Sequence, residues 1–303
     1  MPYITPAGAV ERQILLPEGP VRVLKGGQAA GPGVPLVMIH GGGYDHAGIS
    51  WYRSFESLGS ARRLYAADLP GFGGSRAIAP LHGPVEMADF VVRVMNTMGV
   101  DRAVVVGVSM GGDVALNVVL QHPEFVAGLV LVSPGGLAER VGDPFTHRLA
   151  WLGAQIPDWL LLPMTRVANR YSGSAIKAFV KDASRLPDEV KREFVKEARA
   201  PRAGIAYGRY NQATLGRTRL TNNLRGRMHE IKVPTMLFHG AEDPMVSPDD
   251  SRYAAGAIPD ARLVLVPDTG HWGQLEAHDA FTDAVLEFLA EIDPPAPRES
   301  NRE

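Results

Sequence analysis

Short, mainly apolar runs alternate along this chain with segments in which apolar residues recur every three or four positions. Eight runs predict strands, at 12–16, 20–25, 36–39, 63–67, 103–106, 128–132, 234–239 and 262–266. Several of them lack polar residues entirely, as is typical of strands covered on both faces. Between them, Val91, Val94, Met95 and Met98 mark one face of a helix over 85–99. This alternation predicts an α/β fold with a mostly parallel sheet flanked by helices.

The alternation stops between residues 137 and 230. That segment has no strand-like run, and its prolines divide amphipathic stretches into short helices. We therefore expect a helical cap at 137–230, inserted into an α/β core formed by residues 1–136 and 231–293. The last residues, 294–303, are rich in proline and charge and are expected to form a disordered tail.

The run at 103–106 leads into Gly107-Val108-Ser109-Met110-Gly111, and an apolar segment suited to a buried helix follows. A strand, a sharp turn carrying serine and a helix match the G-x-S-x-G nucleophile elbow. Side chains at Gly107 or Gly111 would collide with the neighbouring strand and helix. The dinucleotide-binding pattern G-x-G-x-x-G fails because Ser109 stands where a glycine must let the pyrophosphate approach. Ser109 is the candidate nucleophile.

A serine hydroxyl needs a base, and the base needs a group that orients it. His271 follows the last predicted strand, and Asp243 follows the strand before it. The carboxyl ends of parallel strands share one edge of the sheet, so both side chains are expected near Ser109. The order Ser, Asp, His is that of hydrolases with this elbow. Glu242 and Asp249 compete with Asp243, which we favour.

Glycines also follow the predicted strand at 36–39, in His40-Gly41-Gly42-Gly43. They let the main chain turn an N–H group inward. Gly42 or Gly43, together with Met110 after the serine, is therefore expected to form an oxyanion hole. Asp68 begins a glycine-rich loop, and we expect it to fix that loop rather than to act in catalysis.

Composition narrows the functional classes. The 303 residues are 45% apolar, enough for a sizeable core, and the formal net charge of -2 without a basic stripe argues against a nucleic-acid partner. The absence of cysteine excludes a disulfide framework, a thiolate metal site and a cysteine nucleophile. No apolar run approaches 18 residues, so we expect a cytoplasmic protein without a membrane partner. We expect a small-molecule substrate and neither metal nor cofactor, and the oligomeric state cannot be read from the sequence.

Five motifs in this order resemble the α/β-hydrolase family over residues 10–292. They are His40-Gly41-Gly42-Gly43, Asp68-Leu69-Pro70-Gly71-Phe72-Gly73-Gly74-Ser75, Gly107-Val108-Ser109-Met110-Gly111-Gly112, His239-Gly240-Ala241-Glu242-Asp243 and Gly270-His271-Trp272. The resemblance implies that fold, with the segment at 137–230 in the place of its cap. The motifs around Ser109 and His271 are most similar to the meta-cleavage-product hydrolases, which split carbon–carbon bonds in ring-fission products. Val108 stands where that family usually has asparagine, and Tyr44-Asp45 where it usually has Pro-Gly.

These observations predict a cofactor-free serine hydrolase that cleaves a carboxylic ester or lactone of a small apolar substrate through an acyl-enzyme. One alternative is carbon–carbon hydrolysis of a 2-hydroxy-6-oxo-dienoate by the same three residues. A second is a perhydrolase- or transferase-like enzyme, in which another group replaces water. A third is a non-catalytic, binding member of the fold.

The substrate pocket is expected to involve Trp272, Val108, Trp151 and Trp159. A carbon–carbon hydrolase must also hold an anionic substrate, which requires a cation reaching down from the cap. The candidates for that cation are Arg185, Arg192, Arg199 and Arg202.

Overall fold

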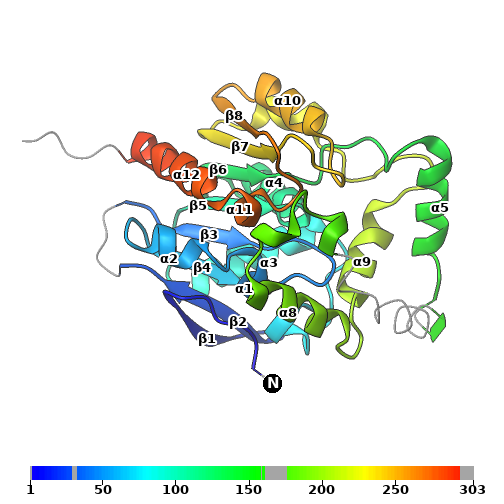
Figure 1. Ribbon diagram of the computed structural model, residues 1–303, viewed down its shortest axis with the longest axis horizontal. Coiled ribbons are helices and arrows are strands. Elements are labelled where there is room, and N and C mark those ends of the chain that lie inside the picture. The colour runs from blue at the N-terminus through cyan, green and yellow to red at the C-terminus, as the bar shows by residue number, and fades with distance from the viewer. Residues whose placement is uncertain (1, 29–32, 158, 161–175, 294–303) are drawn as a thin grey trace, which may run out of the picture.

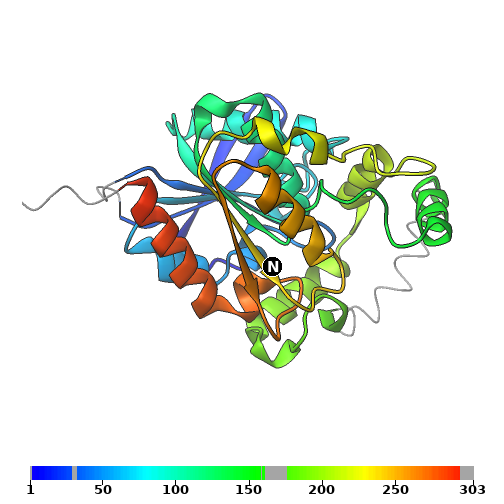
Figure 2. The same cartoon turned by 90° about the horizontal axis from the view of Figure 1, so that it is seen from above.

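A computed structural model describes residues 2–28, 33–157, 159–160 and 176–293 of the chain. At its centre lies one eight-stranded sheet with helices on both sides (Figures 1 and 2). The strands are β1 Ala9–Leu16, β2 Gly19–Gly26, β3 Leu36–Ile39, β4 Leu64–Ala67, β5 Ala103–Val108, β6 Val126–Val132, β7 Thr235–Gly240 and β8 Ala261–Val266. Their order across the sheet is β1-β2-β4-β3-β5-β6-β7-β8.

The sheet is parallel from β4 to β8, whereas β1 pairs antiparallel with β2, and β2 pairs antiparallel with β4. Strands β3, β5 and β6 are buried along their whole length, which explains their uninterrupted apolar sequences. The edge strand β1 exposes Glu11, Arg12 and Gln13. The predicted fold class, a mostly parallel sheet flanked by helices, is confirmed.

In the described ranges, the α-helices are α1 Ala47–Ser50, α2 Ser54–Gly59, α3 Pro84–Thr97, α4 Met110–Gln121, α5 Pro144–Ala154, α8 Asp188–Ala198, α9 Ile205–Thr214, α10 Pro248–Ala257, α11 Gly273–Glu276 and α12 His278–Ile292. Short 3₁₀ helices are η1 Gly73–Ser75, η2 Pro123–Phe125, η4 Ile176–Ala178, η5 Ala183–Arg185 and η6 Arg225–Glu230. One apolar core lies between the sheet and α3, α4 and α10 and includes Phe90 and Val114. A second core on the opposite face includes Phe55 of α2 and Phe288 of α12.

The described chain between β6 and β7 forms helices and one isolated bridge between Leu215 and Leu220. Helices α5 and α9 lie beyond one end of the sheet in both views (Figures 1 and 2). A third apolar cluster joins Phe194 of α8 to Ile49 and Trp272. The division into an α/β core and a separate cap domain stays a prediction, and the expected tail at 294–303 lies outside the described residues. Within the described part, no helix has both the length and the apolar character needed to cross a bilayer.

Candidate active site

Ser109 lies between β5 and α4, at the apex of the predicted elbow. Its backbone angles are φ 56° and ψ -121°, a conformation that residues other than glycine rarely adopt. A Cβ at Gly107 would lie 2.2 Å from the carbonyl oxygen of Gly111, and a Cβ at Gly111 would lie 2.3 Å from that of Ile39. Both glycines are therefore required by the close approach of strand and helix, as predicted.

Asp243 and His271 are in direct contact. The Oδ2 atom of Asp243 lies 2.7 Å from Nδ1 of His271 and 3.2 Å from Nε2 of His239. Its Oδ1 atom accepts the N–H groups of Met245 and Val246, at 2.8 and 3.0 Å. Burial opposes ionisation, but the hydrogen bonds from His239 and His271 outweigh it and hold the pKa of Asp243 well below its usual range. Asp243 is thus a buried anion that can orient His271 and stabilise its protonated form.

The two competitors of Asp243 have other partners. Glu242 accepts the N–H of Thr269 at 2.9 Å, and Asp249 pairs with Arg252 at 2.6 Å. The hydroxyl of Ser109 makes no hydrogen bond to another described residue, so the structure joins Asp243 to His271 without a bond from His271 to the serine. Such bonds are often long in enzymes without substrate.

The loop that carries His271 is tied to the segment before α8. The N–H of His271 donates to the carbonyl of Phe179 at 2.7 Å. The carboxylate of Glu276 accepts the N–H groups of Gly270 at 2.8 Å, Lys181 at 3.2 Å and Asp182 at 2.6 Å. No pattern in the sequence assigned a role to Glu276, although it stands only five positions after the histidine. It holds the histidine loop against residues 179–182.

The glycine loop after β3 is also held by buried side chains. Nδ1 of His40 donates to the carbonyl of Gly41 at 2.7 Å, because its Nε2 accepts the N–H of Leu69 at 3.0 Å. Burial lowers the pKa of His40, which favours this neutral form. Asp45 accepts the N–H of Gly41 at 3.0 Å and the hydroxyl of Ser50 at 2.5 Å. In the sequence Asp45 stands out only as a departure from a family pattern, yet it fixes the loop.

The N–H groups of Gly42, Gly43 and Met110 have no acceptor among the described residues. The ring of Tyr207 from α9 covers Gly42 so closely that a Cβ there would lie 2.3 Å from it. Because the N–H of a helix's first residue also points outward, Met110 and one of the glycines can form the donor pair expected of an oxyanion hole.

A cavity of about 1070 Å³ lies between these loops and helices α5 and α9. Its wall includes Gly43 and Gly135, and the N–H of Gly135 donates to the carbonyl of Ser109 at 2.8 Å. Tyr207 and Tyr210 of α9 also line it, with their rings stacked at a centroid distance of 5.8 Å. The cavity therefore reaches the loops next to Ser109, although Ser109, Asp243 and His271 are not part of its wall, and it is the candidate substrate pocket.

The four residues predicted for the pocket lie outside the wall of this cavity. Trp272 is buried and stacks on Phe179 at 5.6 Å, within the apolar cluster that holds α8. Val108 is fully buried in β5. Trp151 lies half-buried on α5, and Trp159 is 75% exposed. A substrate contact by any of the four stays a prediction, and α9 supplies wall aromatics that the sequence did not indicate.

Asp68 fixes the glycine-rich loop that follows it, as predicted, and also the start of α1. Its carboxylate accepts the N–H groups of Ala47 at 2.9 Å and Gly74 at 2.8 Å, and it pairs with Arg22 at 3.2 Å. Burial raises the pKa of Asp68, but the nearby His46 and Arg22 outweigh burial and hold it below the usual value.

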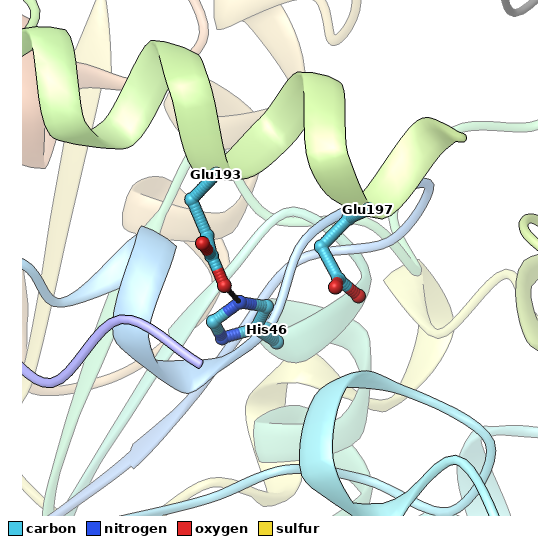
Figure 3. Close-up of side chains that lie close together, drawn as sticks. All are labelled: His46, Glu193 and Glu197. Carbon is cyan, nitrogen blue, oxygen red and sulfur yellow. Dashed lines mark hydrogen bonds and ion pairs between the residues drawn. The ribbon is translucent and has the colours of Figure 1, made fainter. Parts of the chain in front are cut away.

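One group of side chains has the composition of a metal site. Glu193 and Glu197 reach from α8 towards His46, and their ligand atoms lie within 4.8 Å of one another (Figure 3). Both carboxylates already form ion pairs with basic side chains: Lys196 lies 2.7 Å from Glu193, and Arg76 pairs with Glu197. Burial opposes the charge on Glu193, but hydrogen bonds with His46 and Lys196 lower its pKa to about 2.

The tautomer of His46 also argues against a metal at this position. The N–H of Gly48 donates to Nδ1 of His46 at 3.1 Å, so the ring proton of neutral His46 lies on Nε2. That proton is donated to Glu193 at 3.3 Å. A metal ligand nitrogen must carry no proton. We therefore interpret this cluster as a hydrogen bond from His46 and an ion pair from Arg76, which fasten α8 to the segments after β3 and β4.

Comparison with known proteins places this geometry in a family. Residues 34–278 match the family model described as alpha/beta hydrolase fold. The chain is 31% identical over 280 residues to 2-hydroxy-6-oxononadienedioate/2-hydroxy-6-oxononatrienedioate hydrolase of Comamonas testosteroni, covering 86% of this chain and 89% of that protein. It is 30% identical over 249 residues to pimeloyl-[acyl-carrier protein] methyl ester esterase of Nitrosomonas europaea, covering 80% of this chain and 91% of that protein.

Among solved structures, 2-hydroxy-6-oxo-6-phenylhexa-2,4-dienoate hydrolase of Rhodococcus sp. strain RHA1 has the same fold. The TM-score is 0.72 at 24% identity, with 92% of this chain and 98% of that chain covered. The family match spans most of the chain, from before β3 into α12. The chain belongs to the α/β-hydrolase fold family and is a hydrolase of that fold.

Proposed function

We propose that the protein is a serine hydrolase of carboxylic esters or lactones, with Ser109, His271 and Asp243 as its catalytic residues. Ser109 Oγ attacks the carbonyl carbon and passes its proton to Nε2 of His271, while Asp243 holds Nδ1. The N–H groups of Met110 and of Gly42 or Gly43 stabilise the oxyanion. The leaving alkoxide takes the proton from His271. Water, deprotonated by the same nitrogen, then attacks the acyl carbon; the bond to Ser109 Oγ breaks, Oγ takes the proton back from His271, and the acid is released.

The proposal that the substrate is uncharged rests on the charged side chains in the wall of the candidate pocket. Among the described residues, its wall contains two arginines: Arg225, which pairs with Asp250 at 2.5 Å, and Arg140, which is exposed. The four arginines expected to hold a carboxylate, Arg185, Arg192, Arg199 and Arg202, lie outside this wall. Arg185 pairs with Asp268, and Arg192 with Glu189. A neutral ester needs no such cation, whereas an anionic dienoate does.

Carbon–carbon hydrolysis is the second candidate, because the relative from Comamonas testosteroni is named for that class of substrate. Several further relatives at 28–30% identity bear names of the same class, so sequence similarity favours this candidate, although the esterase from Nitrosomonas europaea matches at nearly the same identity. Val108, which is fully buried, offers no side-chain hydrogen bond beside the nucleophile. Charge that spreads through a dienolate would lack that support, at a cost on the order of 10²-fold in rate.

The test compares kcat/KM for 4-nitrophenyl esters of short and medium acyl chains with kcat/KM for a 2-hydroxy-6-oxo-dienoic acid. We expect the esters to be the better substrates, and Ser109→Ala to abolish both turnover and labelling by a fluorophosphonate. Arg252→Ala is the control, since Arg252 is exposed, pairs with Asp249 and lies outside the pocket wall, and it should leave the ester rates unchanged. A preference of more than about tenfold for the dienoic acid would establish the second candidate instead.

A further inference from the structure

The candidate pocket contains a polar cluster that the proposed mechanism does not use. Asp113 lies in the first turn of α4, four residues after Ser109, and its side chain is fully buried. Its Oδ2 atom lies 2.8 Å from the hydroxyl of Tyr210 and 2.5 Å from Nδ2 of Asn222. Its Oδ1 atom accepts a hydrogen bond from the side-chain amide of Asn117, with Nδ2 at 3.1 Å. Tyr210 and Asn222 line the cavity, whereas Asp113 lies behind them.

This cluster lies next to the candidate nucleophile. A Cβ at Gly135 would lie 3.2 Å from the carbonyl oxygen of Ser109 and 3.5 Å from the hydroxyl of Tyr210. Gly135 therefore lies between the main chain of Ser109 and the hydroxyl of Tyr210, which places the cluster close to the elbow.

The hydrogen bonds fix what the cluster presents to a ligand. An ionised carboxylate only accepts, so the hydroxyl proton of Tyr210 points to Asp113. The amide nitrogen of Asn222 uses its protons on Asp113 and on the oxygen of Tyr210, which is 3.2 Å away. The carbonyl oxygen of Asn222 is buried and has no partner among the described residues. A buried acceptor left unpaired costs free energy, and a hydrogen-bond donor on a ligand would recover it once the Asn222 side chain turns towards the cavity.

We infer that Asp113, Tyr210 and Asn222 form a specificity site that selects esters carrying a hydroxyl or amino group and rejects esters carrying a carboxylate. Tyr210 and Asn222 contact the substrate, and Asp113 is a positioning residue that fixes their orientation. Its charge acts in the same direction, since it repels a second carboxylate. Burial raises the pKa of Asp113 to about 6, despite the three side-chain donors, so the carboxylate is ionised at neutral pH. The inference rests on the proposed ester hydrolysis and extends it to a substrate class.

The test uses matched esters in which hydroxyl replaces methyl. The acyl-side pair is 4-nitrophenyl 6-hydroxyhexanoate and 4-nitrophenyl heptanoate, and the alcohol-side pair is 6-hydroxyhexyl butanoate and heptyl butanoate. The hydroxyl preference is the ratio of kcat/KM within a pair. A ratio measured within one enzyme cancels losses of folded protein and differences in overall rate.

For at least one pair, we expect the wild-type hydroxyl preference to exceed that of Tyr210→Phe and Asn222→Leu by roughly tenfold. Asp113→Asn should lower it similarly, because an amide donates where the carboxylate accepts. Gln121→Ala is the matched control: Gln121 lies on the same helix outside this cavity wall, its side chain hydrogen-bonds to Asn117, and the change should leave the preference unchanged. The mono-4-nitrophenyl ester of adipic acid should be a poorer substrate than the heptanoate.

Equal hydroxyl preferences in the wild type and in Tyr210→Phe and Asn222→Leu, with good ester turnover, would overturn this inference alone. Faster hydrolysis of the adipate monoester than of the heptanoate would do the same. If the folded wild type hydrolyses none of these esters, the proposed function fails, and the specificity site fails with it.

Discussion

The close approach between helix α9 and the glycine loop permits a quantitative test of the site geometry. Gly42 has a backbone conformation open to any residue, but a Cβ there would lie 2.3 and 2.4 Å from two ring atoms of Tyr207. Gly42→Ala must therefore displace the ring or the loop. Overpacking of this kind costs about 1–3 kcal/mol, and the lower entropy of the unfolded alanine chain returns about 0.4–1 kcal/mol. We expect a net loss of about 1–2 kcal/mol in the free energy of unfolding.

Tyr207→Ala removes the ring that the new Cβ would meet. In that background, Gly42→Ala should therefore lower the free energy of unfolding by much less than it does in the wild type. The assay is urea unfolding of the wild type, both single variants and the double variant, which gives the coupling energy of the pair. Gly43→Ala is the control. Gly43 has φ 76°, and a Cβ there would meet no atom within 4 Å, so the substitution strains the backbone without a clash. Tyr207→Ala should not rescue it. A coupling energy between positions 42 and 207 within about 0.3 kcal/mol of zero would refute the contact.

Three further predictions follow from the charges of the site and its surroundings. Asp243→Asn should keep the fold, seen by circular dichroism, and lower kcat for esters by roughly 10³-fold or more, because His271 loses its buried anion. Asp113 binds its proton more tightly in the folded protein, with a pKa of about 6 against 3.8 unfolded, so stability should fall as pH rises between these values. The fall is at most about 3 kcal/mol, and urea unfolding of Asp113→Asn should lack it. Glu193 is the opposite case: its pKa falls from 4.5 to about 2 on folding, so its stabilisation is present above 4.5 and lost as pH falls towards 2. Glu193→Gln should lack that loss of stability, measured by thermal unfolding between pH 4.5 and about 2.

The sequence predicts the sheet well because burial on both faces excludes polar residues from its central strands. The run at 36–39 coincides with β3, whereas β5 continues past the predicted 103–106 to Val108. The strand extends because Gly107 and Val108 pair with Leu131 and Val132 of β6, a register that the sequence of one strand does not contain. The contact between Asp243 and His271 was also predictable, since both follow strands that end at the same edge of a parallel sheet.

The pocket was much less predictable, because apolar character alone does not tell a wall residue from a core residue. Trp272 stands beside the candidate base, yet it packs in the apolar cluster with Phe194. Helix α9 has the mixed sequence of a half-exposed helix, and nothing in that pattern indicates that Tyr207 covers Gly42. Its position depends on how the described chain between β6 and β7 packs, which local periodicity does not determine.

Asp113 illustrates why the chemistry of such a pocket needs the tertiary structure. In sequence it is an acidic residue in the first turn of a helix, where a negative charge ordinarily stabilises the helix dipole. That explanation would suffice if the side chain faced water. Instead, Tyr210 and Asn222 approach from distant parts of the chain, and the burial they complete raises the carboxyl pKa while directing their own protons away from the cavity. The same residue that favours the helix behind Ser109 thereby sets which hydrogen bonds a substrate can make in front of it. A substitution here should consequently change substrate preference while the elbow itself stays intact.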